Sequence, residues 1–205
     1  MQKVVIIGGA AGSKIAYEIF DMQDYIVLGF IDNYLEDDKW GDIHPRFLSS
    51  LPPLCDYFVA TGDNYMREKT TSLMFKKFNK TPANAVHPSA IISEHATLGS
   101  GNLICAHAVI NIGAKIGDGN IINTSAVIEH DNEIGNYCQV SPNATLAGYV
   151  KVKDFAFVAS GATVIPEKTV GRGSYVAAGA VVTDDVEDNH LVAGCPAKFV
   201  KEITK

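Results

Sequence analysis

Branched aliphatic residues recur at every sixth position between Val86 and Val182. All seventeen of these positions hold isoleucine, leucine or valine. The series is Val86, Ile92, Leu98, Ile104, Ile110, Ile116, Ile122, Ile128, Ile134, Val140, Leu146, Val152, Val158, Val164, Val170, Val176 and Val182. Two positions earlier the residue is often alanine, as at Ala90, Ala96, Ala108, Ala114, Ala126, Ala144, Ala156, Ala162 and Ala180. A helix repeats every ~3.6 residues and a strand every ~2, so this period indicates a different architecture.

A six-residue period fits a chain that winds round a triangular prism, with one short strand and one corner per repeat. The aliphatic residue points inward, the small residue lets the backbone turn beside it, and three repeats close one coil. Turn-forming residues lie between the aliphatic positions, as in Gly99–Asn102 and Gly117–Asn120. The pattern predicts a left-handed parallel β-helix (hexapeptide repeat) of about five and a half coils over residues 83–187.

Residues 1–82 alternate between strand-like and helix-like patterns. Strands are expected at Lys3–Ile7, Tyr25–Asp32 and Asp56–Thr61, and helices at Lys14–Met22 and Asn64–Phe78. This order predicts a small α/β, Rossmann-like domain before the solenoid. After Val182 the next sixth position is Asp188, so the repeat stops and residues 188–205 are expected to form a closing tail.

The small-residue turn Gly8–Ser13 follows the first expected strand. Such a turn lets backbone N–H groups approach a phosphate at the start of a helix. Its glycine spacing differs from that of dinucleotide sites, and ~82 residues make a small sheet. A nucleotide-linked sugar near Asp32, Asn33 and Gly62 therefore fits better than NAD. The alternative is a turn that only reverses the chain.

Composition narrows the possible functions. A formal net charge of −6 argues against nucleic acid or an anionic membrane as the main partner, because both select basic surfaces. The sequence has no apolar run of membrane-spanning length and no signal-peptide pattern at its start, which favours a cytoplasmic protein. Its four cysteines lack metal-ligand spacing, so free thiols and no bound metal are expected.

His130 is the histidine flanked on both sides by carboxylates, Glu129 and Asp131. A carboxylate on one imidazole nitrogen fixes the tautomer and leaves the other nitrogen as a general base. The alternative is an exposed or edge-packed histidine. His87 and His95 are expected to be structural, as is His107, although a role for it stays open.

Asn123 precedes His130 by seven residues and is expected on the adjoining face of the same coil. Its amide could bind substrate or stack at a corner of the solenoid. Ser141, Ser160 and Ser174 show no base partner in the sequence, which favours direct transfer without a covalent enzyme intermediate.

Five segments resemble one family of enzymes: Lys3–Gly9, Phe30–Asn33, Ala60–Asn64, Asn123–Asp131 and Gly194–Lys198. The chain is similar to the bacterial sugar acetyltransferases of the left-handed β-helix type. These include the UDP-4-amino-sugar N-acetyltransferases of bacillosamine synthesis and the sialic acid O-acetyltransferases. The resemblance covers essentially the whole chain in the same order, and Asn123–His130 is its most specific part.

The resemblance implies a homotrimer with acetyl-CoA bound between neighbouring β-helices. It implies that His130 is the general base, supported by Asp131, and that the Gly148 amide lies near the thioester carbonyl. The implied residues for the nucleotide-linked sugar are Ala10, Ala11, Gly12, Asp32, Asn33 and Gly62. Those implied for the acetyl-CoA cleft, besides Gly148, are Gln139, Ser160 and Ala178. Two family histidines are replaced here, by Gly12 on the sugar side and by Gln139 on the coenzyme side.

The leading hypothesis is an acetyl-CoA-dependent N-acetyltransferase that acts on the amino group of a nucleotide-linked 4-amino-4,6-dideoxy sugar. A sugar O-acetyltransferase of the sialic acid type is the enzymatic alternative, because the same base serves a hydroxyl. A metal enzyme resembling the γ-carbonic anhydrases would use three histidines at subunit interfaces. A purely structural solenoid is the fourth hypothesis.

Overall fold

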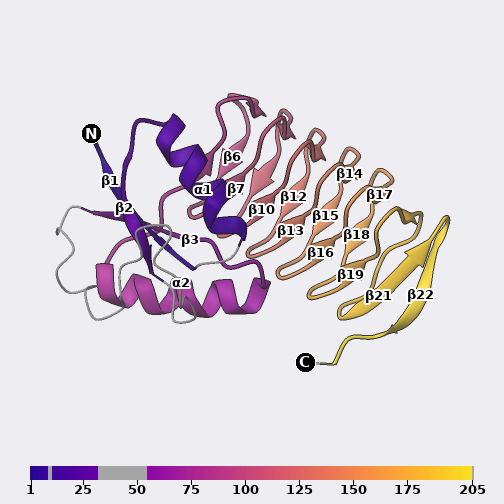
Figure 1. Cartoon of the computed structure of the whole chain (residues 1–205). Coiled ribbons are helices and arrows are strands. Elements are labelled where there is room, and N and C mark those ends of the chain that lie inside the picture. Colours follow the sequence, from indigo (N-terminus) through magenta and orange to yellow (C-terminus); the bar gives the residue numbers. More distant parts are fainter. Residues whose placement is uncertain (9–10, 32–54, 205) are drawn as a thin grey trace.

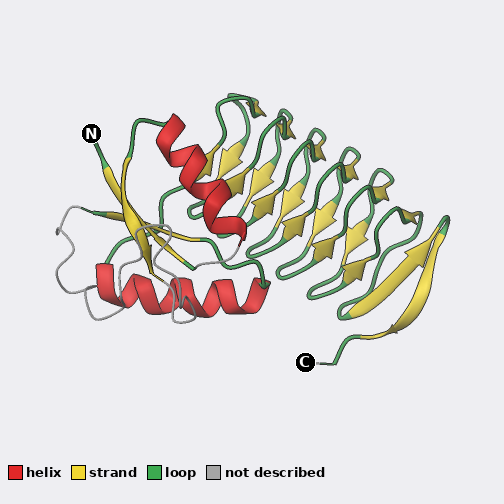
Figure 2. Ribbon diagram, viewed as in Figure 1, coloured by secondary structure: helices red, strands yellow, loops and turns green. Residues whose placement is uncertain are grey.

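The computed structural model describes residues 1–8, 11–31 and 55–204. An α/β layer at the N-terminal end packs against the first coils of a long solenoid, and a hairpin closes the other end (Figures 1 and 2).

The α/β layer contains a three-stranded parallel sheet in the order β2-β1-β3. The strands are β1 (Lys3–Ile7), β2 (Ile26–Ile31) and β3 (Asp56–Val59), and the helices are α1 (Ala11–Met22) and α2 (Asn64–Phe78). The sequence correctly predicted the order of these elements. The sheet is smaller than that of a complete dinucleotide-binding fold, which has about six strands.

Helix α1 begins at Ala11, three residues earlier than the sequence predicted. Residues 11–13, assigned above to a turn, therefore belong to the first turn of the helix. The Ser13 hydroxyl donates a hydrogen bond to the Gly8 carbonyl and ties this helical turn directly to the end of β1. Helix α2 begins after Asp63, whose carboxylate accepts a 2.8 Å hydrogen bond from the backbone N–H of Met66.

The solenoid has three faces, each a parallel sheet of two-residue strands. Face 1 contains β4 (Ala85–Val86), β7 (Leu103–Ile104), β10 (Ile121–Ile122), β13 (Gln139–Val140), β16 (Phe157–Val158) and β19 (Tyr175–Val176). Face 2 contains β5 (Ile91–Ile92), β8 (Val109–Ile110), β11 (Val127–Ile128), β14 (Thr145–Leu146), β17 (Thr163–Val164) and β20 (Val181–Val182). Face 3 contains β6 (Thr97–Leu98), β9 (Lys115–Ile116), β12 (Glu133–Ile134), β15 (Lys151–Val152) and β18 (Thr169–Val170).

Stacked strands keep one register along each face. Ile122 pairs with Ile104 on one side and with Val140 on the other, so each coil takes three hexads. The second residue of each strand points inward, and these aliphatics form one continuous core with the small alanines. Burying each such side chain stabilises the fold by about 1.5–3 kcal/mol. The roughly six turns confirm the predicted left-handed parallel β-helix.

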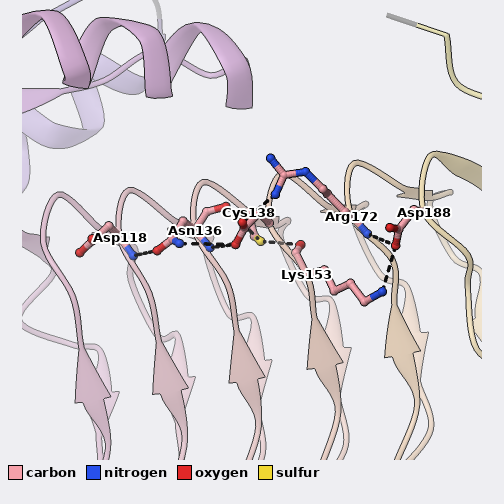
Figure 3. Close-up of polar contacts among 7 residues, drawn as sticks. Asp118, Asn136, Cys138, Lys153, Arg172 and Asp188 are labelled. Carbon is pink, nitrogen blue, oxygen red and sulfur yellow. Dashed lines mark hydrogen bonds and ion pairs between the residues drawn. The ribbon is translucent and has the colours of Figure 1, made fainter.

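A polar ladder runs along the corner between faces 3 and 1 (Figure 3). The backbone N–H of Asp118 donates to the Asn136 side-chain oxygen, and the backbone N–H of Asn136 donates to Asp154, each over 2.8 Å. The ladder ends where the backbone N–H of Arg172 donates to Asp188. Side-chain oxygens thus satisfy corner N–H groups from coil to coil.

The C-terminal residues, which the sequence assigned to a closing tail, form a hairpin. Strand β21 (His190–Gly194) pairs in parallel with β19, and β22 (Ala197–Glu202) returns antiparallel to β21. Val192 and Ala197 join the apolar core. The hairpin forms because these residues cover the end of the column and extend face 1.

Candidate active site

His130 and Asp131 lie in the corner between β11 on face 2 and β12 on face 3. The imidazole Nδ1 of His130 is 3.0 Å from the Asp131 Oδ2 atom. The two side chains are 46% and 45% exposed, so substrate can reach the pair. Asp131 adopts a left-handed backbone conformation with φ +58°.

Glu129, the other acidic neighbour in the sequence, takes a different partner. Its Oε2 atom accepts a 2.9 Å hydrogen bond from the Asn111 amide, one coil earlier. The structure therefore assigns the imidazole to one of the two flanking carboxylates, Asp131.

The coil that follows completes the surroundings of the ring. Tyr149 meets His130 edge to face, with ring centroids 5.2 Å apart and planes at 89°. A Cβ atom on Gly148 would lie 2.6 Å from both Cε1 and Nε2 of the imidazole. The face of the imidazole ring, over its Cε1–Nε2 bond, therefore lies against Gly148.

A cavity of about 210 Å³ separates the α/β layer from face 1. Its walls contain Gly12, Ile15, Phe58, Val59, Ala60, Gly62, Arg67, Gly101, Leu103, Asn120, Ile121, Asn123 and Gln139. Four of these residues, Gly12, Gly62, Asn123 and Gln139, were singled out in the sequence as binding residues. The amide nitrogen of buried Asn120 has no hydrogen-bond partner within the described part of the chain.

Arg67 was missed by the sequence analysis, although its buried side chain fixes one wall of this cavity. It makes five hydrogen bonds, to the carbonyls of Thr61, Gly62, Gly119 and Cys138 and to the Asn64 side chain. Burial lowers the pKa of Arg67 to about 10. A charged residue within a helix reads as solvent-exposed from the sequence, so only the fold reveals this role.

The remaining predicted residues lie at two different corners. Ser160 and Ala178 are exposed on successive coils between faces 1 and 2, where the Gly179 N–H donates to the Ser160 carbonyl. Gly148 lies with His130 at the other edge of face 2. Ala10, Asp32 and Asn33 lie outside the described residues, and Ala11 is described only through its backbone.

Two other histidines, His87 and His190, have local side-chain partners. The Nδ1 atom of His87 lies 2.8 Å from the Ser89 hydroxyl, and the His190 ring packs on Phe199. Over residues 1–8, 11–31 and 55–204, no three His, Cys, Asp or Glu side chains gather as a metal site. Neither described helix has the length and apolar character needed to cross a bilayer.

Solved structures resemble this chain over nearly its whole length. PerB from Caulobacter crescentus, solved in complex with CoA and GDP-perosamine, is 36% identical with a TM-score of 0.91, and 98% of each chain is covered. The acetyltransferase domain of PglB from Neisseria gonorrhoeae is 30% identical with a TM-score of 0.91, covering 98% of this chain and 100% of that one. WeeI from Acinetobacter baumannii, at 23% identity and a TM-score of 0.88, covers 98% of this chain and 100% of its own and shares the fold.

No protein-family model and no curated protein matches the chain. The structural relatives nevertheless agree with one another and cover both the α/β layer and the solenoid. At 36% and 30% identity over almost the full length, they show that this chain belongs to the sugar acetyltransferases of the left-handed β-helix family.

Proposed function

We propose that this enzyme transfers the acetyl group of acetyl-CoA to the amino group of a nucleotide-linked 4-amino-4,6-dideoxy sugar, with His130 as general base. One observation carries the proposal: His130 Nδ1 is paired with Asp131 at an exposed corner, which leaves Nε2 for a substrate. PerB, solved with CoA and GDP-perosamine, supports the class of both substrates.

The proposed mechanism follows from the protonation of the imidazole. Asp131 accepts a hydrogen bond from Nδ1–H and keeps the proton on that nitrogen. Nε2 then carries the lone pair and removes a proton from the sugar amine as it attacks the thioester. The backbone N–H of Gly148 would donate to the developing oxyanion beside this nitrogen. His130 then returns its proton to the departing thiolate, and no covalent enzyme intermediate is formed.

The nucleotide-linked sugar would bind at the cavity between the α/β layer and face 1. We assign residues 1–82 to a Rossmann-like nucleotide-sugar domain, residues 83–187 to the acetyltransferase domain and residues 188–205 to the closing tail. Gly12, Gly62 and Asn123 lie in the wall of this cavity and support its assignment as the sugar site. Ala10, Ala11, Asp32 and Asn33 remain proposed parts of the same site.

The proposed assembly is a homotrimer in which face 2 packs against a second copy. The outward row of face 2 is uncharged: Ile91, Val109, Val127, Thr145, Thr163 and Val181. On face 3 the corresponding row carries the solvated ion pairs of Glu133 with Lys115 and Lys151. A row without such charges, in which four of the six residues are aliphatic, favours burial between subunits.

A trimer would also unite the two groups of predicted residues. Ser160 and Ala178 lie at one edge of face 2 and Gly148 at the other, so one chain alone cannot gather them. Packing face 2 against a neighbour would bring opposite corners together, with acetyl-CoA between them. Gln139, also proposed for the acetyl-CoA cleft, lies in the wall of the cavity between the α/β layer and face 1. We place the reaction in the cytoplasm, where the thiols of Cys55 and Cys105 stay reduced.

The test is an assay of the purified protein with acetyl-CoA and a panel of UDP-, dTDP- and GDP-linked amino sugars. A base-stable amide product is expected by mass spectrometry, whereas an alkali-labile ester would identify the O-acetyltransferase alternative. His130→Ala should lower kcat by roughly 100-fold or more. The exposed His95→Ala is the matched control, and full activity of His130→Ala would overturn the mechanism.

The assembly has its own test, which does not depend on activity. Light scattering should give three times the chain mass for the wild type and the mass of one chain for Val127→Lys. Thr169→Lys places the same charge on face 3 and should leave the trimer intact. A monomeric wild type, or a trimer that tolerates Val127→Lys, would overturn the proposed assembly.

A further inference from the structure

We propose that Gly113 is a positioning residue that holds the Asp131 carboxylate against His130. The inference rests on the proposed role of His130 as general base. It concerns a glycine one coil before the pair, in the same corner between faces 2 and 3, where Asp131 donates its N–H to the Ile112 carbonyl over 3.0 Å.

The carboxylate of Asp131 occupies the space that a side chain on Gly113 would fill. A Cβ atom at this position would lie 2.4 Å from Oδ1 and 3.2 Å from Cγ of Asp131. With Oδ1 seated against the Gly113 backbone, the other oxygen, Oδ2, is the one that meets His130 Nδ1 at 3.0 Å. Any larger residue would push the carboxylate away from the ring.

The backbone conformation does not by itself require glycine here. Gly113 has φ +73°, but Asp131, Tyr149 and Glu167 hold the next equivalent places in the corner with φ +58°, +61° and +65°. Residues with side chains are therefore accepted at this corner. The contact with Asp131 is what distinguishes position 113.

Gly148 acts in the same way on the other side of the pair. Its missing Cβ makes room for the face of the imidazole ring, as Gly113 makes room for the carboxylate. The pair thus lies in a slot between two glycines, one in the coil before it and one in the coil after it. The slot fixes both side chains without forming a further hydrogen bond to either.

A double-mutant cycle on kcat tests the inference. Gly113→Ala should lower kcat to roughly the level of Asp131→Ala, about tenfold to a hundredfold below the wild type, with both KM values within about twofold. The combined variant should be no slower than Asp131→Ala. An unchanged kcat in Gly113→Ala would overturn the role. So would a loss of kcat from Gly113→Ala that is the same in the wild type and in Asp131→Ala.

Gly161→Ala is the matched control for backbone strain. Gly161 has φ +67° and no atom within 4 Å of an added Cβ, so its variant carries the strain without the contact and should keep kcat. If Gly113→Ala does not fold, Gly113→Asn replaces it, because asparagine tolerates left-handed conformations better.

An NMR measurement separates this inference from the proposed function. The Asp131-bound Nδ1–H of His130 should give a slowly exchanging proton signal in the wild type that is lost in Gly113→Ala. If that loss occurs while His130→Ala stays active, the positioning stands and the general-base proposal fails. If the signal persists in Gly113→Ala, the positioning fails whatever the role of His130.

Discussion

The Asn111 amide, one coil earlier, donates a 2.9 Å hydrogen bond to the Glu129 carboxylate, whereas the Asp131 carboxylate meets His130. The two acids beside the histidine are therefore unequal. Glu129→Gln keeps the contact with Asn111 possible and should leave kcat within about threefold of the wild type. Asp131→Asn should lower kcat by roughly tenfold to a hundredfold, because the amide no longer favours the required tautomer. Equal losses in the two variants, measured under saturating substrates, would contradict this division.

Arg67 joins the end of β3 to the solenoid through contacts buried from solvent. Arg67→Met keeps the length of the side chain but leaves the carbonyls of Thr61, Gly62 and Gly119 without their donor. We expect the free energy of unfolding in urea to fall by about 3 kcal/mol. The free energy of unfolding of Arg67→Lys should lie between those of the wild type and Arg67→Met, because lysine retains the charge without the planar fork.

Arg172→Met is the control for the Arg67 variants. Arg172 is half-exposed and pairs with Asp154, so its loss should cost less than about 1 kcal/mol. A cost for Arg67→Met no larger than for Arg172→Met would show that the buried contacts do not stabilise the junction.

The four cysteines should differ sharply in reactivity. Burial raises the pKa of Cys138 to about 12 and that of Cys105 to about 11, and it also raises the pKa of Cys55. Cys195 is exposed in the C-terminal hairpin. A thiol reagent at pH 8 should modify one group rapidly in the native protein and four after denaturation. The rapid phase should disappear in Cys195→Ser, and its persistence would point to an accessible thiol elsewhere.

Asp188 links stability to pH at the end of the polar ladder (Figure 3). The Arg172 N–H, and next the Lys153 ammonium, hold the pKa of this carboxyl below its ordinary value of 3.8. The lower pKa in the folded state means that the contribution to stability is present above pH 3.8 and is lost as the pH falls through the folded value.

Asp188→Asn should therefore lower the free energy of unfolding at pH 7 by less than about 1 kcal/mol, and the difference should shrink near pH 3. Urea unfolding at both pH values measures it. The exposed Glu94→Gln serves as a control that should show no such change. A difference that grows in acid would contradict the assigned sign.

Local patterns were enough to predict most of the chain's architecture. The six-residue period predicted the solenoid because each inward aliphatic occupies the same place in every coil, as Ile122 does between Ile104 and Val140. The order of strands and helices before it followed from the same kind of pattern. The start of α1 and the final hairpin were missed, because Ser13 and Val192 act through contacts that the local sequence does not reveal.

The sequence by itself determined the repeat, the family resemblance and the histidine with an acid on each side. Only the tertiary structure decided that Asp131 pairs with the ring while Glu129 binds Asn111, since that choice depends on residues one coil away. It also brought Gly12, Gly62, Asn123 and Gln139 to one cavity, and it buried Arg67 beside them. The physical reason is the winding of the chain, which stacks residues from successive coils and sets neighbours in the sequence apart.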